Sequence, residues 1–508
     1  MSTMEEMTPV RGGTEWEVFG LIGEPRARPV PLTSTVLEPV MAQLHPDIKA
    51  VGHIRNRFLQ NGARLYIDVG NHPEYCTPPS EDFEEAVAHT YAGEAEFMDM
   101  VRRAQIADKI GGYAIYRRVL AKDADKPGHY TGLGYHTSLG IRRRRDGVRN
   151  TPEARLSHTL HLSTASLYLG AGAIVQNSVG DWVYIRHQKE PCLNCEYHWD
   201  TMTSRPIANT RDESHAGDDQ IRIHITSGDA NHSPWQQRMT FGISAIILRT
   251  IDAGISSPVT VPDGQFMKLL RLASRDMPLS QVATLEKDGQ PYRMSPYDVQ
   301  EMLYKEHDDF LRNHMVTEAE VWAHQQHGQV LSDLKLHDSA ILSNRIDWAA
   351  RLENMGGQAV LDDDSTHWGS PKLLRLDMAY DLVGTRKWSP DDADDPNTPL
   401  DADEVKGFGV RRRSAEFSEW MPSNEVIQRA RFEPPTGGKT TGQALARAAF
   451  IREFGRTPAE YAKSGRPDAI ADWEAGKVNN RTHTWPLSPE GPTRHLFDHN
   501  WEDTREFV

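Results

Sequence analysis

Residues Asn61 to Pro78, NGARLYIDVGNHPEYCTP, combine an alternating strand pattern, two carboxylates and a histidine within the length of one strand and one turn. Apolar and polar residues alternate from Ala63 to Val69, and successive side chains of a strand point to opposite faces. The aliphatic side chains therefore share one face, whereas Arg64, Tyr66 and Asp68 share the other. We interpret this polar face as a candidate reaction surface.

The chain is expected to bend directly after this strand. Gly70 precedes His72-Pro73-Glu74, and glycine and proline are typical of chain reversals. The bend allows Glu74 to fold back towards Asp68. Two neighbouring carboxylates suit a metal site or acid-base catalysis. The alternative is that both are solvated residues at the end of a strand.

This stretch resembles the Pup ligase and depupylase family, which are carboxylate-amine ligases related to glutamine synthetase. Family members read N-G-A-R-x-Y-x-D followed by H-P-E-Y at this place. The ligase branch has D-V-G-S-H-P-E-Y, whereas the depupylase branch has D-H-A-H-P-E-Y. Asp68 to Tyr75, DVGNHPEY, is closer to the ligase branch.

Two later segments resemble the same family. Thr203 to Ala216, TSRPIANTRDESHA, follows the family's S-R-P-I-x-N-T-R-D-E-P-H-A, and Ile221 to Asn231, IRIHITSGDAN, follows its R-R-L-H-V-I-x-G-D-x-N. Arginine forks suit carboxylate and phosphate oxygens, although ion pairs with nearby acidic residues are the alternative. We interpret these segments as a cradle for phosphate and carboxylate groups, in which we expect Arg205, Arg211, Arg222 and His224 to bind the cofactor.

The family opens with a strand that ends in G-x-E-x-E, and the first glutamate of that motif bridges the metal ions. We expect this strand at residues 17–22, where Glu24 is the carboxylate available as a ligand. If the strand aligns on Gly20, Ile22 occupies the ligand position. This departure would put full metal occupancy in doubt.

A second departure lies at Gly132 to Arg142, where the family has Y-G-x-H-E-N-Y. His136 is kept, but Thr137, Ser138 and Leu139 replace Glu-Asn-Tyr. The resemblance implies metal ligands at Glu24, Tyr66, Glu74 and His136.

Helical spacing of apolar residues predicts a helix over residues 81–107, with Asp82 able to cap its start. Two further segments resemble family motifs: Asp347-Trp348 with Arg351 resembles D-W-x-x-K, and Ser370 to Tyr380 resembles D-P-K-x-x-x-L-D-x-x-Y. A basic residue there faces either the nucleotide or the surface.

Composition is that of a globular protein: 508 residues, 38% hydrophobic and 25% charged. The net charge of -15 argues against a nucleic-acid partner, because duplex binding needs a basic face. No apolar run approaches the roughly 18 residues of a membrane span, and the first residues, MSTMEEMTPV, lack a signal-peptide pattern. We expect a cytoplasmic protein without a membrane partner.

Three cysteines do not make a disulfide framework, which fits a reducing compartment. Cys192 and Cys195, with His187 and His198, provide four potential zinc ligands. Their spacing is tighter than in ordinary zinc fingers, so we favour an unliganded loop over a zinc site.

The patterns predict an α+β fold, and the resemblance implies a glutamine-synthetase-like cradle: a curved, mainly antiparallel sheet backed by helices. We expect four parts: a flexible extension at residues 1–14, a catalytic domain at 15–387, an acidic linker at 388–406 and a small C-terminal domain at 407–508.

The resemblance implies that ATP and Mg²⁺ activate a glutamate carboxylate on Pup or a Pup-like protein, which a lysine amine of a protein substrate then attacks. Asp68 would deprotonate that amine. Three alternatives share the fold: a depupylase or deamidase, an amide synthetase for a smaller acid, and a non-catalytic ATP-binding homologue. The short spacing between Glu24 and Asp68 disfavours the depupylase, which inserts a long loop there.

Overall fold

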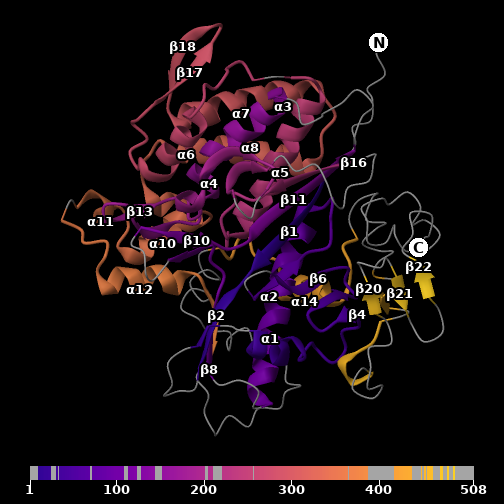
Figure 1. Cartoon of the computed structure of the whole chain (residues 1–508). Coiled ribbons are helices and arrows are strands. Elements are labelled where there is room, and N and C mark those ends of the chain that lie inside the picture. Colours follow the sequence, from indigo (N-terminus) through magenta and orange to yellow (C-terminus); the bar gives the residue numbers. More distant parts are fainter. Residues whose placement is uncertain are drawn as a thin grey trace, which may run out of the picture.

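The structure is a computed structural model, drawn in Figure 1. It describes residues 10–23, 30–31, 34–68, 71–107, 112–122, 128–142, 152–200, 204–209, 220–255, 257–363, 365–386, 417–436, 448, 451–452, 455–460, 470–472, 477–479 and 484–486. The candidate residues Glu24 and Arg211 and the expected linker at 388–406 lie outside these ranges.

A seven-stranded antiparallel sheet forms the centre of the fold (Figure 1). Its strands, in spatial order, are β16 (Gln220–Ile225), β11 (Tyr135–Arg142), β1 (Arg11–Glu17), β7 (His72–Cys76), β6 (Arg64–Asp68), β5 (Asn56–Leu59) and β4 (Ala50–His53). The hairpin of β6 and β7 thus lies beside β1, and β1 in turn lies beside β11.

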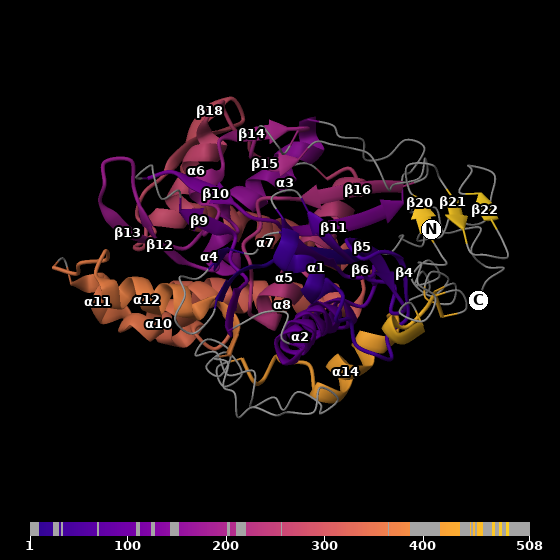
Figure 2. The ribbon, with the colours of Figure 1, turned by 60° about the horizontal axis from the view of Figure 1, so that its bottom comes forward.

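One face of this sheet is apolar and packs on helices. Trp16, Leu65 and Tyr75 are at most 2% exposed and belong to one core cluster with residues of α2 (Phe83–Ile106). Apolar residues of β11 and β16 pack in a second cluster with α5 (Pro234–Asp252). Figure 2 shows both helices on the same side of these strands. The polar residues that alternate with these core residues are left on the opposite face.

Helix α2 begins and ends close to the predicted limits. The Asp82 carboxylate accepts hydrogen bonds from the backbone N–H groups of Glu84 and Glu85, at 2.8 and 3.2 Å. These bonds satisfy donors that the first helical turn leaves unpaired. The cap therefore fixes the start of the helix that supports the central sheet.

The other strands form smaller sheets. A four-stranded sheet has the order β19 (Leu382–Arg386), β8 (Gly112–Tyr116), β2 (Phe19–Gly23) and β3 (Val30–Pro31). The remaining strands are β9 (Leu120–Lys122) with β10 (Tyr130–Gly132), β12 (Ala173–Gln176) with β13 (Trp182–Ile185), β14 (Cys195–His198) with β15 (Pro206–Asn209), β17 (Ala283–Lys287) with β18 (Gln290–Met294), and β20 (Ile470–Asp472), β21 (Lys477–Asn479) and β22 (Thr484–Pro486).

Helices provide the second layer. Besides α2 and α5, they are α1 (Ser34–Met41), α3 (Pro152–Thr164), α4 (Ser166–Leu169), α6 (Gln265–Arg275), α7 (Pro296–Asn313), α8 (Glu318–Leu334), α9 (Ser339–Leu342), α10 (Asp347–Met355), α11 (Gln358–Asp362), α12 (Pro371–Tyr380) and α14 (Asn424–Phe432), with a short 3-10 turn, η1 (Glu190–Cys192). The expected α+β class, a mainly antiparallel sheet backed by helices, is confirmed. None of the described helices is long and apolar enough to cross a bilayer.

The C-terminal segment contributes α14, which packs against α2. The Arg431 guanidinium lies 2.7 Å from the Glu96 carboxylate and 3.2 Å from that of Asp99. Farther along, Ala50 of β4 and Arg456 exchange backbone hydrogen bonds of 3.1 Å. Described parts of the C-terminal segment are therefore attached to the sheet and to its helical layer, while the domain boundary at residue 407 stays a prediction.

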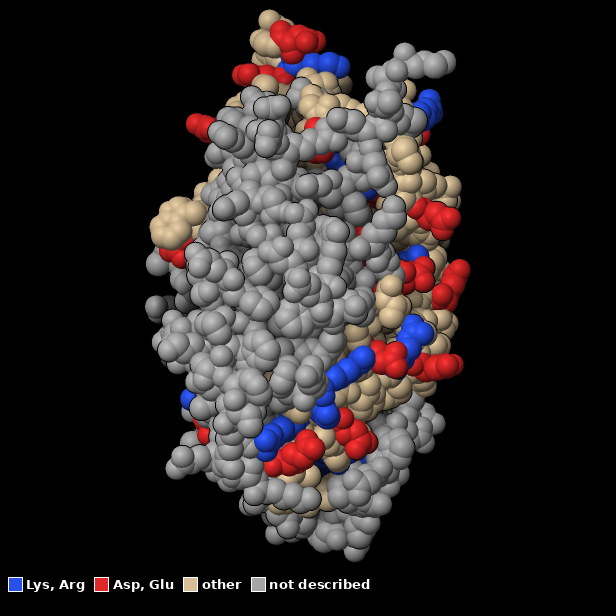
Figure 3. All heavy atoms as spheres, turned by 90° about the vertical axis from the view of Figure 1, so that its right-hand side faces the viewer, with Lys and Arg blue, Asp and Glu red and all other residues tan. Residues whose placement is uncertain are grey.

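Acidic and basic side chains alternate on the described part of the face shown in Figure 3. They are not gathered by sign into one large patch there.

A buried network of ionic groups connects the end of β8 with α10 and α12. Asp381 is fully buried between Arg118, at 2.7 Å, and Arg351. The same two arginines bind Asp377, at 2.9 and 3.0 Å. Burial alone would raise the pKa of Asp381, but Arg351 and Arg118 outweigh it and hold that pKa well below its usual range. Arg351 is fully buried and bound to Asp377 and Asp381, which excludes the surface role that the sequence left open.

We predict that Asp381→Asn lowers the free energy of unfolding by about 3 to 5 kcal/mol, because Arg118 and Arg351 stay buried but lose one of the two carboxylates that they share. Urea denaturation measures this. Asp309→Asn, at an exposed position on α7, is the matched control and should change stability by less than about 0.5 kcal/mol. A similarly small loss for Asp381→Asn would contradict a structural role for the network.

A second buried group consists of histidines in the helical layer. His161 of α3, His307 of α7 and His327 of α8 are at most 2% exposed. His327 Nε2 lies 3.0 Å from Gln300 Oε1, whereas both ring nitrogens of His161 have no hydrogen-bond partner among the described residues. Burial lowers the pKa of His307 to about 3 and holds those of His161 and His327 well below their usual range.

We predict that the chain loses stability as the pH falls from 7.5 to 5.5. The folded state keeps these imidazoles neutral, whereas unfolded histidines take up protons below their ordinary pKa of about 6.5. Their contribution is therefore complete above pH 6.5 and falls by about 1.4 kcal/mol for each histidine by pH 5.5.

Urea titrations at both pH values test this prediction. His307→Gln should reduce the pH dependence by the contribution of one histidine, whereas His337→Asn, at an exposed position, should leave it unchanged. An identical pH dependence in the wild type and His307→Gln would show that His307 is protonated equally in both states.

Candidate active site

Four carboxylates gather on the polar face of the central sheet. Glu15 and Glu17 belong to β1, Asp68 to β6 and Glu74 to β7. Register places Glu17 opposite Glu74 and Glu74 opposite Tyr66, so these side chains lie on one face of three adjacent strands. The expectation that Glu74 folds back towards Asp68 is confirmed.

The first group consists of Glu17, Asp68 and Glu74, each of which offers an oxygen within 4.8 Å of the others. His72 Nδ1 lies 3.0 Å from Glu17 Oε2. Burial raises the pKa of Glu17, but its hydrogen bonds to His72 and to the Gly134 backbone outweigh this and lower it. Burial and the neighbouring carboxylates raise the pKa of Glu74 well above its usual range.

A glycine makes room for this group. A Cβ at Gly134 would lie 2.6 Å from Glu17 Oε1, closer than side-chain carbons approach other atoms. The absence of a side chain there lets the backbone N–H reach the Glu17 carboxylate.

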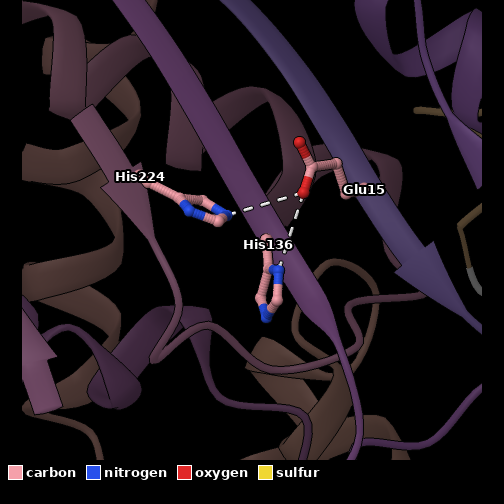
Figure 4. A group of neighbouring side chains, drawn as sticks. All are labelled: Glu15, His136 and His224. Atoms are coloured by element: carbon pink, nitrogen blue, oxygen red, sulfur yellow. Dashed lines mark ion pairs between the residues drawn. The ribbon is translucent and has the colours of Figure 1, made fainter. Parts of the chain in front are cut away.

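The second group consists of Glu15, His136 and His224 (Figure 4). Glu15 Oε2 lies 3.7 Å from His136 Nδ1 and 3.5 Å from His224 Nε2. The two imidazoles meet edge to face, with ring centroids 4.8 Å apart. Burial lowers the pKa of His136 to about 4, although its hydrogen bond to Glu15 opposes this, so the ring is neutral and can ligate a metal.

The donor atoms of both groups are suitable ligands for divalent cations. The raised pKa of Glu74 reports negative charge that the described protein groups do not neutralise, and a divalent ion would supply that neutralisation. Glu17, Asp68 and Glu74 offer oxygen ligands only, whereas Glu15, His136 and His224 offer mixed ligands. Tyr66, expected as a ligand, hydrogen-bonds to Glu74, and burial raises the pKa of its phenol far above its usual range.

Arg222, which we expected in the cradle, also reaches the polar face of the central sheet. Its Nη2 lies 2.9 Å from Glu15 Oε1, and Nη2 and Nε donate to Ser138 Oγ at 2.9 and 3.2 Å. Ser138 is one of the residues that replace the family's Glu-Asn-Tyr. The substitution thus leaves a polar contact, because the serine hydroxyl orients the guanidinium.

Arg205 lies in the segment before β15. Its backbone N–H donates to Asn194 Oδ1 at 2.9 Å. The structure brings Asp68, Glu74, His136, His224 and Arg222 together on one face of the central sheet.

The expected first strand is wrong in register. The strand that enters the site is β1, and its residues Gly13 to Glu17 read G-T-E-W-E, which matches the family's G-x-E-x-E. Ile22 belongs to β2 in the other sheet, so it does not replace a metal ligand. Sequence reasoning missed Glu15 and Glu17 because it placed residues 11–14 in a flexible extension, although the G-x-E-x-E motif is present in the sequence.

The two cysteines and two histidines considered for zinc contact different groups in the described structure. His187 Nε2 lies 2.9 Å from the Ser227 carbonyl, whereas His198 Nδ1 lies 3.0 Å from the Asp200 carbonyl. The four residues do not form one of the two ligand clusters found among the described residues.

Comparison with known proteins assigns the chain to a family. The sequence model of the family described as Pup-ligase protein matches residues 25–388. The chain belongs to this family. The matched range omits β1, so the structure adds Glu15 and Glu17 to what the family match itself covers.

Curated relatives agree with this assignment. The Pup--protein ligase of Jonesia denitrificans is 27% identical over 95% of this chain and 96% of its own length. That of Acidimicrobium ferrooxidans is 26% identical over 87% and 88%, respectively.

Solved structures share the fold. The ligase PafA in complex with the prokaryotic ubiquitin-like protein Pup has a TM-score of 0.70 at 20% identity, covering 97% of this chain and 93% of that chain. PafA in complex with ADP has a TM-score of 0.64 at 22% identity, covering 89% and 91%.

We predict that Glu74→Gln weakens Mn²⁺ binding at least tenfold, roughly the loss seen when even outer-shell partners of a metal are removed. Isothermal titration of the purified chain with Mn²⁺ measures this. Glu318→Gln, at an exposed position on α8, is the control. Equal affinities in the wild type and Glu74→Gln would remove Glu74 from the ligand set.

We predict that Ser138→Ala weakens nucleotide binding about tenfold, because Arg222 loses the acceptor of two N–H groups. Titration with ADP measures this, and Ser138→Asn should retain most of the affinity. Ser332→Ala, at an exposed position, is the control. If Arg222→Ala loses affinity but Ser138→Ala does not, the serine does not orient the arginine.

Proposed function

We propose that the chain is an ATP-dependent isopeptide ligase. It phosphorylates a glutamate carboxylate of Pup or a Pup-like protein and transfers that acyl group to an amine such as a substrate lysine. Family membership and the Pup--protein ligases named above support this activity. The observation that carries it is the face on which two potential metal groups and Arg222 meet across adjacent strands.

The two ligand groups and the arginine suit phosphoryl transfer. Bound Mg²⁺ would neutralise ATP phosphates and the developing charge of the transferred group, and Glu15, Glu17, Glu74 and His136 would hold it. Arg222 binds the anionic end of the nucleotide, as a planar guanidinium does for phosphate oxygens. Its present partner, Glu15, keeps it aimed at this place.

The acceptor step is acyl transfer to nitrogen. The amine attacks the acyl carbon of the mixed anhydride, the C–N bond forms, and the bond to phosphate oxygen breaks with release of phosphate. The Asp68 carboxylate accepts the proton that the amine loses. Asp68 lies at the end of β6, beside His72 on β7, at the edge of the carboxylate group.

A hydrolase of the depupylase type is the second candidate, because the same face would activate water in place of an amine. The D-V-G sequence of β6 and its turn favours the ligase. The non-catalytic alternative loses one of its supports, since Glu15 and Glu17 supply the charge that Ile22 was expected to remove.

One assay separates these activities. Purified chain is incubated with ATP, Mg²⁺ and Pup-like peptides that end in glutamate or glutamine, with a lysine-bearing protein, and ADP, ammonia and conjugate are followed. We expect ADP and conjugate from the glutamate peptide. Release of ammonia from the glutamine peptide, without formation of conjugate, would identify a deamidase. Binding of ATP without formation of ADP would identify a non-catalytic binding protein.

We predict that Asp68→Ala abolishes conjugate formation while ATP binding stays within about twofold of the wild type, because the proposed role is proton abstraction. Titration with ATP and Mg²⁺ accompanies the conjugation assay. Lowered Mg²⁺ affinity in this variant would instead identify Asp68 as a metal ligand, and near wild-type conjugation would remove it from the mechanism.

A further inference from the structure

Asn61 is a buried amide in the turn between β5 and β6, and none of the roles above uses it. It is 1% exposed, and both polar atoms of its side chain have partners. Oδ1 accepts the Ala63 backbone N–H at 3.0 Å. Nδ2 donates to the Tyr75 hydroxyl at 3.1 Å and to the Ala430 carbonyl at 2.9 Å. One side chain therefore joins the start of β6, strand β7 and the last turn of α14.

The contacts with α14 satisfy carbonyl groups at the end of that helix. The last four carbonyls of an α-helix have no partner within the helix. Asn61 binds the carbonyl of Ala430. Its neighbour Gln60 donates from Nε2 to the Phe432 carbonyl at 3.3 Å, and the Oε1 of Gln60 accepts the Lys49 backbone N–H at 2.7 Å. The turn before β6 thus caps the C-terminal end of α14.

The contact with Tyr75 reaches the strand that carries Glu74. The Tyr75 ring is enclosed by the core: its centroid lies 5.7 Å from that of Trp16, and a Cβ at Gly93 of α2 would lie 2.4 Å from its Cδ1. The hydroxyl is therefore held in one place. Through it, Asn61 connects the start of β6 to β7, one residue away from a candidate metal ligand.

Helix α14 is held by charge as well as by this cap. It packs against α2 (Figure 2), where the buried Arg431 guanidinium pairs with Glu96 and Asp99. Glu96 also accepts the His45 backbone N–H at 3.0 Å. The helix is therefore fixed along its length by an ion pair and at its end by the Asn61 amide.

The buried amide of Asn61 selects a geometry more than it adds stability. Each of its hydrogen bonds replaces a bond to water, so the net gain is small. Displacement of a partner, however, leaves a buried polar group unsatisfied, which is costly. The geometry selected is that of β6 relative to β7, the strands that place Asp68 and Glu74 beside Glu17.

We propose that Asn61 is a positioning residue for the group of Glu17, Asp68 and Glu74, and that it couples this group to the docking of α14. The inference rests on the proposed function, which assigns the group to a divalent cation. Such cations require oxygen ligands at about 2.0 to 2.6 Å, so a small displacement of β6 relative to β7 weakens binding. The C-terminal segment thereby acts on the cation site without touching it.

Calorimetric titration with Mn²⁺ tests the positioning role. We expect Asn61→Ala and Tyr75→Phe each to weaken Mn²⁺ binding about three- to tenfold, less than the roughly 10- to 100-fold loss typical of a group that contacts a metal ligand directly. Tyr75→Phe keeps the ring and removes only the hydroxyl, so it decides the question if Asn61→Ala does not fold. Unchanged Mn²⁺ affinity in the folded variants would overturn the proposal.

Arg249→Lys is the control that separates positioning from stability. Arg249 of α5 is 3% exposed and pairs with Glu320 of α8 at 3.0 Å, within the helical layer. Disturbing this buried pair should lower the melting temperature and leave Mn²⁺ affinity unchanged. If Arg249→Lys weakens Mn²⁺ binding as much as Asn61→Ala does, the affinity follows stability alone and Asn61 has no positioning role.

A double-mutant cycle tests the coupling to α14. Arg431→Lys removes the planar fork that binds Glu96 and Asp99. We expect this change to weaken Mn²⁺ binding when Asn61 is present and to have little further effect in Asn61→Ala. Additive losses, or no loss in either background, would overturn the coupling.

Failure of the proposed function gives a different result. A wild type that binds Mn²⁺ but forms no conjugate would overturn the ligase activity, and the titrations would still decide the role of Asn61. If Glu74→Gln leaves Mn²⁺ binding unchanged, the carboxylate group is not the cation site, and the positioning role is overturned with it.

Discussion

The arrangement of the site depends on the burial of one face of the central sheet. Trp16, Leu65 and Tyr75 are fixed against α2, and the strand period then places their sequence neighbours on the opposite face. Carboxylates that repel one another are brought together by this packing, because moving a strand by one residue would expose the aromatic and aliphatic side chains. Apolar burial thus supplies the free energy that holds a cluster of like charges.

The charge balance of that face differs from one edge to the other. Glu15 is surrounded by Arg222, His136 and His224, which hold its pKa well below the usual range even though burial raises it. Glu74 has no such compensation and remains strongly shifted in the opposite direction. Protein cations thus offset the carboxylate charge at one edge, whereas at the other edge burial and neighbouring carboxylates disfavour the charged form of Glu74. The site therefore carries its uncompensated negative charge on the side of Glu17, Asp68 and Glu74.

The sequence alone predicted the hairpin of β6 and β7, but it did not predict which strand pairs with that hairpin. Alternation and the H-P-E-Y turn predicted the faces of β6 and β7, because both depend on residues adjacent in the chain. The pairing of β1 with β7 and β11 depends on contacts between distant segments, and single-sequence patterns do not encode them directly. Without that pairing, residues 11–14 were placed in a flexible extension and Glu15 and Glu17 were missed. The burial of Arg351 was not predicted, because its carboxylate partners lie farther along the chain.

The replacement of Glu-Asn-Tyr by Thr137, Ser138 and Leu139 illustrates why a motif should be interpreted with its neighbours. Thr137 and Leu139 point into the core, so only the middle position faces the site. There the serine accepts both Arg222 N–H groups, which an asparagine oxygen can also do. The substitution therefore changes the residue type while an acceptor for the arginine is kept. A departure from a family pattern reduces function only where the lost group faces the chemistry and nothing on the adjacent strands supplies its equivalent.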